Sequence, residues 1–288
     1  MGATLGPNRY GKAGIHLATV VRGPDRHDFS ERLIDVRLEG DFEAVHLEGD
    51  NAACLPTDTM RSSATALAAE EPGEAIETFA LRYSEYLLDA SPAASRAEVW
   101  VVERPWERVV VDGSPHPRAF TRGDFRWTAH VVRDRTDAVL FAGVDELYLL
   151  KTGGSAFAGF LRDRYTVLAE AEDRILATRL EAEWRYARTD LDHAAERAAA
   201  AEAIVRAFVR HDESRSVQHT LWHMGTAVLE ACPNIEEVRF SMPNLHHIAA
   251  DLEAIGGTND GVVFVVTDAP SGQIEGTVRR SADATPPP

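Results

Sequence analysis

Alternating apolar and polar positions in the first half of the chain predict strands that are each buried on one face. Apolar residues spaced three and four apart predict helices, and one such apolar face is formed by Ile76, Phe79, Tyr83 and Leu87. The predicted strands are about 14–21, 32–38, 98–104 with a continuation past Pro105, and 120–132, and the predicted helices are about 58–69 and 75–88. The order is therefore strand, strand, helix, helix, strand, strand.

The second half of the chain repeats this order of elements. Its predicted strands are about 138–150, 175–186, 238–246 and 262–266, and its predicted helices are about 191–209 and 217–231. No clear residue-level repeat relates the two halves, so the repetition is one of elements only. A duplicated unit is the simplest interpretation.

This pattern predicts an α+β fold in which each half is a four-stranded antiparallel sheet with two helices packed on one face. We expect a first domain at 1–136, a second domain at 137–280 and a disordered, Pro-rich tail at 281–288. Small sheets of this kind leave open edges that must be paired or covered. Oligomerisation into a closed barrel would satisfy those edges.

The overall charge limits the classes of partner. The 288-residue chain has a formal net charge of −16 and a pI near 5.1, and its 44% hydrophobic content is sufficient for a sizeable core. Nucleic acid and anionic membrane surfaces repel such an acidic protein, so we expect neither as a partner. An anionic substrate would require a local positive pocket.

The cysteines and the N-terminus bear on the cellular location. Cys54 and Cys232 form no disulfide framework, and neither belongs to a metal-binding or redox motif. The N-terminal sequence lacks an apolar signal core, and no apolar run approaches the length that spans a membrane. Two reduced thiols fit an intracellular protein, and we expect a cytoplasmic location.

A predicted helix start is followed by a predicted strand end in the segments Ser216–Trp222 and Pro243–His246. Ser216 is a suitable N-cap, and Gln218 lies in the first turn, where free backbone N–H groups point outward. Asn244 and His246 continue the row of Met242 if the strand is regular. This combination of polar side chains predicts a site.

Arg174 begins a row of even-numbered positions, from Leu176 to Tyr186, that is mostly apolar. A guanidinium on the covered face of a sheet is costly unless it is paired. The sequence leaves two interpretations open. One is an ion pair with Asp173 or another acidic neighbour, and the other is a planar fork that binds a planar anion.

Thr57 and Asp58 precede an apolar run of helical spacing, so they are predicted to begin a helix. Capping explains both residues, and a helix start also favours an anion. Taken alone, Lys12 is typical of a solvated surface lysine. Two helix starts, Lys12 and Arg174 could nevertheless make a positive pocket in an acidic protein.

Several separated blocks of the chain resemble the urate oxidase (uricase) family and occur in the family order. They are Tyr10-Gly11-Lys12, Thr57-Asp58, Phe157 to Asp163, Tyr165-Thr166 through Ile175, and the two segments 216–222 and 243–246. One departure is Arg61-Ser62-Ser63, where the family usually has Lys-Asn-Thr. This departure leaves Thr57 and Asp58 intact but changes the residues around them.

The resemblance implies two tandem tunnelling-fold domains in each chain and a homotetramer around a central tunnel. It implies active sites that are shared between subunits. The implied reaction converts urate, molecular oxygen and water into 5-hydroxyisourate and hydrogen peroxide in purine catabolism, with no cofactor and no metal.

The resemblance also implies roles for individual residues. The substrate-binding residues would be Thr57, Asp58, Phe157, Arg174, Val217, Gln218 and Asn244. Phe157 would stack on the purine, and Asn244 with Thr57 would hold oxygen, peroxide or water above the ring. Lys12, Thr57 and His246 would form a catalytic proton relay, to which the neighbouring subunit contributes the lysine and the threonine.

Two further functions remain possible on the sequence alone. One is another tunnelling-fold enzyme that acts on a purine or a pterin, and the other is a purine-binding homologue without turnover. His219 and His223 are four residues apart on a predicted helix, a spacing that can serve a metal. Because the sequence indicates no third ligand, we interpret them as solvated or hydrogen-bonded histidines.

Overall fold

The computed structural model describes residues 2–281, and the chain divides into two compact units. The first unit comprises Met1–Gly143 and Arg185–Arg197, and the second comprises Val144–Trp184 and Ala198–Pro288. The predicted tail, apart from Ser281, lies outside the described residues. No helix of the described part is both long and apolar enough to cross a membrane.

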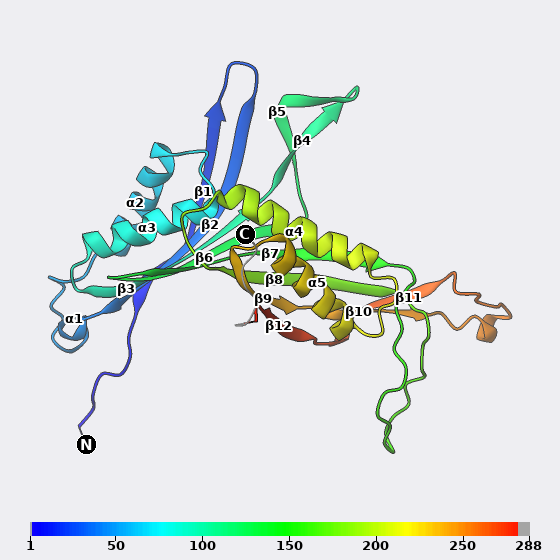
Figure 1. Cartoon of the computed structure of the whole chain (residues 1–288). Coiled ribbons are helices and arrows are strands. Elements are labelled where there is room, and N and C mark those ends of the chain that lie inside the picture. Colours follow the sequence, from blue (N-terminus) through cyan, green and yellow to red (C-terminus); the bar gives the residue numbers. More distant parts are fainter. Residues whose placement is uncertain (1, 282–288) are drawn as a thin grey trace. The chain divides into compact units, whose positions relative to one another are not determined.

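The first unit is built on an antiparallel sheet with the strand order β1-β2-β3-β6 (Figure 1), and β7, the next strand in the order, begins in this unit and ends in the second. These strands are β1 (Tyr10–Arg22), β2 (His27–Gly40), β3 (Ala94–Arg104), β6 (Arg126–Asp134) and β7 (Ala138–Lys151). In β2, Ile34, Val36 and Leu38 are fully buried and alternate with less buried residues, as the apolar alternation predicts.

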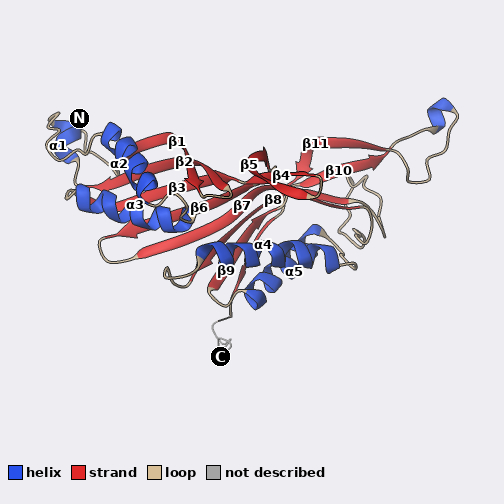
Figure 2. Cartoon of the chain, turned by 90° about the horizontal axis from the view of Figure 1, so that it is seen from above, coloured by secondary structure: helices blue, strands red, loops and turns tan. Residues whose placement is uncertain are grey.

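Helices α2 (Thr57–Glu70) and α3 (Ile76–Ala90) lie over this sheet, as Figure 2 shows. Helix α3 packs against β3 and β6, and α2 packs against β1. The apolar face predicted for α3 is confirmed, because Ile76, Phe79, Tyr83 and Leu87 are all fully buried. A short helix, α1 (Glu43–Leu47), precedes them and was not predicted.

The single strand predicted at 120–132 is wrong, because two strands occupy this region. Strand β5 (Ser114–Arg122) pairs with β4 (Trp106–Val111) in a separate two-stranded sheet, whereas β6 pairs with β3. The chain leaves the main sheet after Pro105 and returns at Gly123, whose N–H donates to the Pro105 carbonyl at 2.9 Å. Apolar alternation continues through both strands, so it does not reveal the change of partner.

In the second unit, strand β8 (Leu176–Tyr186) pairs with β9 (Ile235–Ser241) and with β10 (Asn244–Ala249). Strand β11 (Phe264–Gly272) pairs with β10, and β12 (Glu275–Arg279) pairs with β9. The single strand predicted at 238–246 is wrong, because it is interrupted at Met242 and Pro243. Proline has no N–H to donate to a strand partner, so it marks the interruption.

Helix α4 (His193–Arg210) begins in the first unit and continues in the second, and α5 (Val217–Ala231) lies wholly in the second. A 3₁₀ turn (Glu253–Ile255) precedes β11. The apolar stripe predicted for α5 is confirmed, because Val217, Leu221, Met224 and Val228 are buried. Helix α5 packs closely on β9 and β12, and a Cβ at Gly225 would lie 2.4 Å from the Val278 side chain.

Candidate functional site

The segment 154–157 is hydrogen-bonded to the residues that precede α5. The Ala156 N–H donates to the Ser214 carbonyl at 2.7 Å, and the Ser214 N–H donates to the Gly154 carbonyl at 3.2 Å. Gly154 has a φ of +71°, and a Cβ there would lie 2.9 Å from the Asp212 carbonyl oxygen. Glycine therefore permits the close approach of this segment to the start of α5.

The other edge of the same segment is bonded to the residues that precede β8. Phe157 and Ala171 exchange two backbone hydrogen bonds of 2.7 and 3.0 Å, and the Arg174 N–H donates to the Ser155 carbonyl at 2.7 Å. The segment 154–157 thus joins the residues around Arg174 to the beginning of α5. Phe157, Arg174 and the first turn of α5 belong to one hydrogen-bonded arrangement within the second unit.

The Arg174 guanidinium is half-buried and lies with its central carbon 5.4 Å from the centre of the Phe157 ring. Its Nε is buried and makes no hydrogen bond with the described part of the chain, and no carboxylate of that part forms an ion pair with it. Burial lowers the pKa of Arg174 below its ordinary value. An unpaired, partly desolvated guanidinium favours the binding of an anion.

The ion pair between Arg174 and Asp173 that the sequence left open does not form. Asp173 instead accepts the Gly154 N–H at 2.7 Å and the Ser155 N–H at 3.4 Å. The Asp173 carboxylate therefore holds the segment 154–157 in place and leaves the Arg174 guanidinium unpaired. Phe157 stacks on Phe160, with ring centres 5.0 Å apart and planes 15° apart.

The first turn of α5 has the geometry that the sequence predicts. The Ser216 Oγ accepts the His219 N–H at 3.1 Å, which confirms Ser216 as the N-cap. Val217 is buried with 3% of its surface exposed, whereas Gln218 is exposed. The N–H groups of Val217 and Gln218 lie before the first intrahelical hydrogen bonds, so they can donate to a ligand.

Asn244 and His246 lie two residues apart on β10, where side chains share one face of the strand. The Asn244 Nδ2 and the His246 Nδ1 are 3.4 Å apart. Asn244 pairs with Thr178 of β8 on one side and with Gly272 of β11 on the other. The two side chains therefore form a second polar pair within the second unit, on a strand that begins after Pro243 rather than continuing from Met242.

The other predicted residues, Lys12, Thr57 and Asp58, lie in the first unit. Lys12 is half-buried on β1, next to an irregularity of the β1–β2 pairing that lies between Lys12 and Ile15. Helix α2 begins at Thr57, as predicted, and Thr57 is half-buried. Asp58 is exposed, and its Oδ1 forms an ion pair with the Arg61 Nη2 at 2.7 Å.

The Tyr10-Gly11-Lys12 segment is fixed by close backbone contact and by burial of the tyrosine. A Cβ at Gly11 would lie 1.9 Å from the Val36 carbonyl oxygen, so only glycine fits there. Tyr10 packs edge-on against Phe42. Burial, followed by contact with Cys54, raises the pKa of Tyr10 to about 12, which keeps its hydroxyl protonated.

Sequence reasoning missed one residue of chemical interest. His211 lies directly after α4, and its ring contacts the rings of His219 and His223, the pair noted from its helical spacing. The structure thus adds a third ring that the sequence did not indicate, and the hydrogen bonds among the rings agree with the interpretation of the pair as hydrogen-bonded histidines. The only signal in the sequence was a third histidine eight residues before His219, and spacing alone does not show that a chain turns back there.

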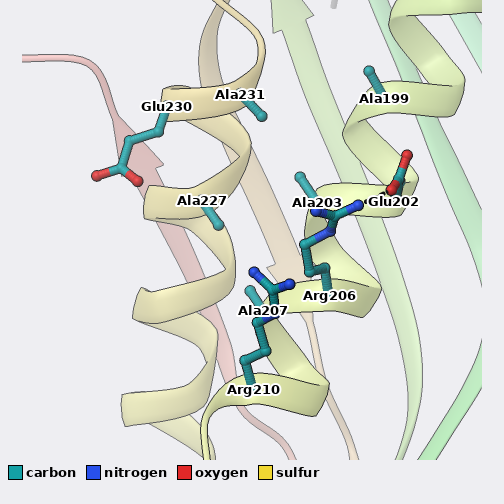
Figure 3. A pocket seen from close by; sticks show the side chains of 9 residues that line it. All are labelled: Ala199, Glu202, Ala203, Arg206, Ala207, Arg210, Ala227, Glu230 and Ala231. Carbon is teal, nitrogen blue, oxygen red and sulfur yellow. Dashed lines mark hydrogen bonds and ion pairs between the residues drawn. The ribbon is translucent and has the colours of Figure 1, made fainter.

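A groove of about 530 Å³ lies between α4 and α5 and contains none of the predicted site residues. Figure 3 shows that its walls carry small side chains, with charged groups around them. The lining residues are Ala199, Glu202, Ala203, Arg206, Ala207, Arg210, Ala227, Glu230 and Ala231. This groove is therefore separate from the candidate site.

Comparison with known proteins gives one consistent result. The family model described as "Uricase" matches residues 8–126 and 140–275. A uricase of Arthrobacter globiformis is 36% identical over 96% of this chain and 90% of that protein, and one of Danio rerio is 34% identical over 96% and 94%. The crystal structure of the uricase from Arthrobacter globiformis superimposes with a TM-score of 0.92 at 35% identity, covering 100% of this chain and 99% of that one.

Proposed function

The chain belongs to the uricase family and is a urate oxidase, and we propose that it oxidises urate directly with molecular oxygen, without a prosthetic group. The products would be 5-hydroxyisourate and hydrogen peroxide. Urate gives up two electrons and two protons, which reduce oxygen to hydrogen peroxide. The oxidised ring then adds the elements of water, so that atoms and electrons balance.

The observation that carries this proposal is the unpaired Arg174 guanidinium beside the Phe157 ring. Urate is a flat anion, and a guanidinium offers two parallel N–H donors in one plane. Phe157 would stack on the purine. Gln218 and the free N–H of Val217, at the start of α5, would bind the opposite edge, because an amide side chain can both donate and accept.

The proton transfers would use Lys12, Thr57 and His246. A urate monoanion must lose a second proton before its ring is electron-rich enough to reduce oxygen. A lysine held within hydrogen-bond reach of a substrate can act as a general acid or base. Thr57 would connect this lysine to the ring and to Asp58. His246, paired with Asn244, would return the protons to the departing peroxide.

Asn244 and Thr57 would hold oxygen, then peroxide or water, above the purine plane. Asn244 is 8% exposed, so its amide is largely desolvated, and an electrostatic interaction is stronger in that environment. Fixed donors around the reacting anion require no reorganisation during the reaction, which is how active sites stabilise developing charge.

The complete site would form between copies of the chain. In this proposal, each chain has two tunnelling-fold domains, 1–136 and 137–280, and four chains close a barrel. Lys12 and Thr57 of one copy would then complete the site that Arg174 and Gln218 of another copy begin. Strand β1 supports this proposal, because it is thirteen residues long and stands at an edge of the sheet. Long open edges are normally paired or covered.

A cytoplasmic location is part of the same proposal. Cys54 is half-buried, Cys232 is buried, and no disulfide joins them. Free thiols persist in reducing compartments, whereas oxidising compartments favour disulfides.

The test is a paired measurement on purified protein that has been stripped of metal with a chelator. We expect loss of urate absorbance to match oxygen uptake one to one, with hydrogen peroxide as a product. Activity that returns only after addition of a flavin or a transition metal would contradict direct oxidation. Release of ammonia or opening of the ring without oxygen uptake would instead indicate a different reaction on a purine or pterin.

A further inference from the structure

Three histidine rings meet where α4 ends and α5 begins. The His211 Nε2 lies 3.2 Å from the His219 Nδ1, and the His223 Nε2 lies 3.1 Å from the His219 Nε2. One ligating nitrogen from each ring can be chosen so that all three lie within 4.8 Å of one another. The rings of His211 and His223 are stacked, with centres 4.0 Å apart.

The two short separations involve different nitrogens of His219, so only one of them can belong to a common ligand set, whose three nitrogens lie within 4.8 Å of one another. Three nitrogens bound to one tetrahedral ion at about 2.0–2.1 Å are about 3.4 Å apart. The spacing of His219 and His223 explains part of the arrangement, because residues four apart share one face of a helix. His211 completes it from outside the helix, since the chain turns after Arg210 and returns to begin α5.

The surroundings of two of the three rings favour their neutral form. Burial, and then the neighbouring rings of His223 and His219, lower the pKa of His211 to about 4. Burial and the charges of His223 and Arg215 also lower the pKa of His219. Neutral imidazole is the form in which histidine binds a metal ion.

The charged neighbours of the cluster are Lys151, Asp212 and Arg215, and the Arg215 backbone N–H donates to the His219 Nδ1 at 3.3 Å, which leaves the Nε2 of His219 as its ligand atom. The Lys151 Nζ donates to the His211 carbonyl at 2.5 Å and so points at the backbone. Asp212 is the nearby carboxylate that partly balances the charge of Lys151. Among the described residues the cluster consists of imidazoles alone, a ligand set that suits zinc, copper or nickel and not magnesium or calcium.

We infer that His211, His219 and His223 bind one divalent transition-metal ion, which joins the end of α4 to the first two turns of α5. Three imidazoles and an open fourth position are a ligand set typical of zinc. The ion would stabilise the turn between the helices and would take no part in the oxidation of urate. Because His219 follows Gln218 directly, an occupied site would also fix the helix start that carries this glutamine.

The direct test is a titration of the metal-stripped protein with Zn²⁺, followed by calorimetry and thermal unfolding. We expect one tight site in each chain and a rise in melting temperature on binding. His223→Ala removes an exposed ligand from the surface of α5 and should therefore fold. It should weaken zinc binding at least about tenfold and abolish the rise in melting temperature. His116→Ala, which removes an exposed histidine of β5, is the matched control and should bind zinc as the unaltered protein does.

A second measurement uses Co²⁺, whose visible absorption bands are intense in tetrahedral coordination. The unaltered protein should show these bands at one equivalent, and both His223→Ala and His211→Ala should lose them. Equal zinc affinity and equal cobalt spectra in the unaltered protein and in His223→Ala would overturn the inference. The readout does not depend on urate turnover, so it is separate from the test of the proposed function.

Discussion

Arg174 shows how one side chain can provide a positive site in an acidic protein. Its backbone is hydrogen-bonded to Ser155, and its guanidinium lies against Phe157 without a carboxylate partner in the described part of the chain. The nearest candidate for a partner, Asp173, is occupied by backbone N–H groups. A net charge of −16 is therefore compatible with local binding of an anion.

Replacement of Arg174 tests its role in binding. Arg174→Gln removes the charge and the fork, and Arg174→Lys keeps the charge without the planar geometry. We expect kcat/KM for urate to fall on the order of a hundredfold in Arg174→Gln. If the guanidinium binds urate through two parallel hydrogen bonds, Arg174→Lys should lose a similar factor. Steady-state kinetics on folded variants check this. A lysine variant with unchanged kcat/KM would contradict the bidentate assignment.

Lys12 and Thr57 are expected to affect turnover more than binding. Lys12→Met and Thr57→Ala each remove a member of the relay, and general acid–base groups typically contribute about a hundredfold or more to rate. The dissociation constant of a urate analogue under anaerobic conditions should change by less than about threefold. Equal losses in turnover and in affinity would remove both residues from the relay.

Glu237 gives a pH-dependent contribution to stability. Burial raises the pKa of this carboxyl, but hydrogen bonds and charges from Arg239 and Arg279 outweigh burial, so its net pKa lies below the ordinary value. A group whose pKa is lowered in the folded state stabilises the fold above its unfolded pKa. That stabilisation is lost as the pH falls through the folded pKa.

The corresponding variant is Glu237→Gln, compared with Glu230→Gln on the exposed surface of α5. At pH 7 we expect Glu237→Gln to lower the free energy of unfolding by about 1 kcal/mol. The difference from the unaltered protein should shrink below about pH 4, where the unfolded-state carboxyl is itself protonated. Thermal unfolding across this pH range checks the expectation, and a difference that grows on acidification would contradict it.

At the level of single residues, features that depend on the local sequence could be predicted, whereas contacts between residues from different elements could not. The position of Ser216 before an apolar stripe predicted an N-cap, and the row from Leu176 predicted a partly buried Arg174; the structure confirms both. The roles of these residues toward urate remain predictions. The contact of His211 with His219 depends on how the chain turns between two helices, which no local pattern encodes.

The start of α5 is the element on which the proposed urate binding and the histidine cluster both depend. Ser216 caps it, and the Ser214 hydroxyl bonds to that of Thr220 at 2.7 Å, so the turn is fixed before the helix begins. Gln218 and His219 then occupy fixed positions in the first turn. The orientation of both follows from the cap.

Removal of the cap should therefore affect both stability and binding. Ser216→Ala leaves the His219 N–H without its acceptor, and loss of an N-cap costs about 1 kcal/mol. We expect a lower melting temperature and a weaker urate complex, with Ser62→Ala on the exposed face of α2 as the control. A variant with a lower melting temperature and unchanged urate affinity would show that the cap does not position Gln218.

Helices were predictable as elements because each has a clear apolar face, as in α3 and α5. Strand ends were less predictable, because alternation continues where the partner changes. At the β4–β5 hairpin and at Pro243 the apolar alternation continues although the strand ends and the pairing partner changes. Strand β12 was missed, since its five residues carry one buried apolar side chain, Val278.

At the scale of the whole molecule, the predicted residues fall into two sets. Arg174, Gln218 and His246 lie in the second unit, and Lys12 and Thr57 lie in the first. The account requires that the two sets meet between different copies of the chain. Urate binding and the proton relay would otherwise be incomplete.

Complementation between two inactive variants would show whether a site is shared between chains. Lys12→Met and Arg174→Gln chains, each with a different affinity tag, would be co-expressed, and mixed assemblies isolated through both tags. If the site is shared, a Lys12 from one variant can meet an Arg174 from the other, and about a quarter of the sites regain both residues. We predict recovery of about a quarter of the unaltered urate oxidation rate. Mixed assemblies as inactive as either variant alone would show that the site is not shared between chains.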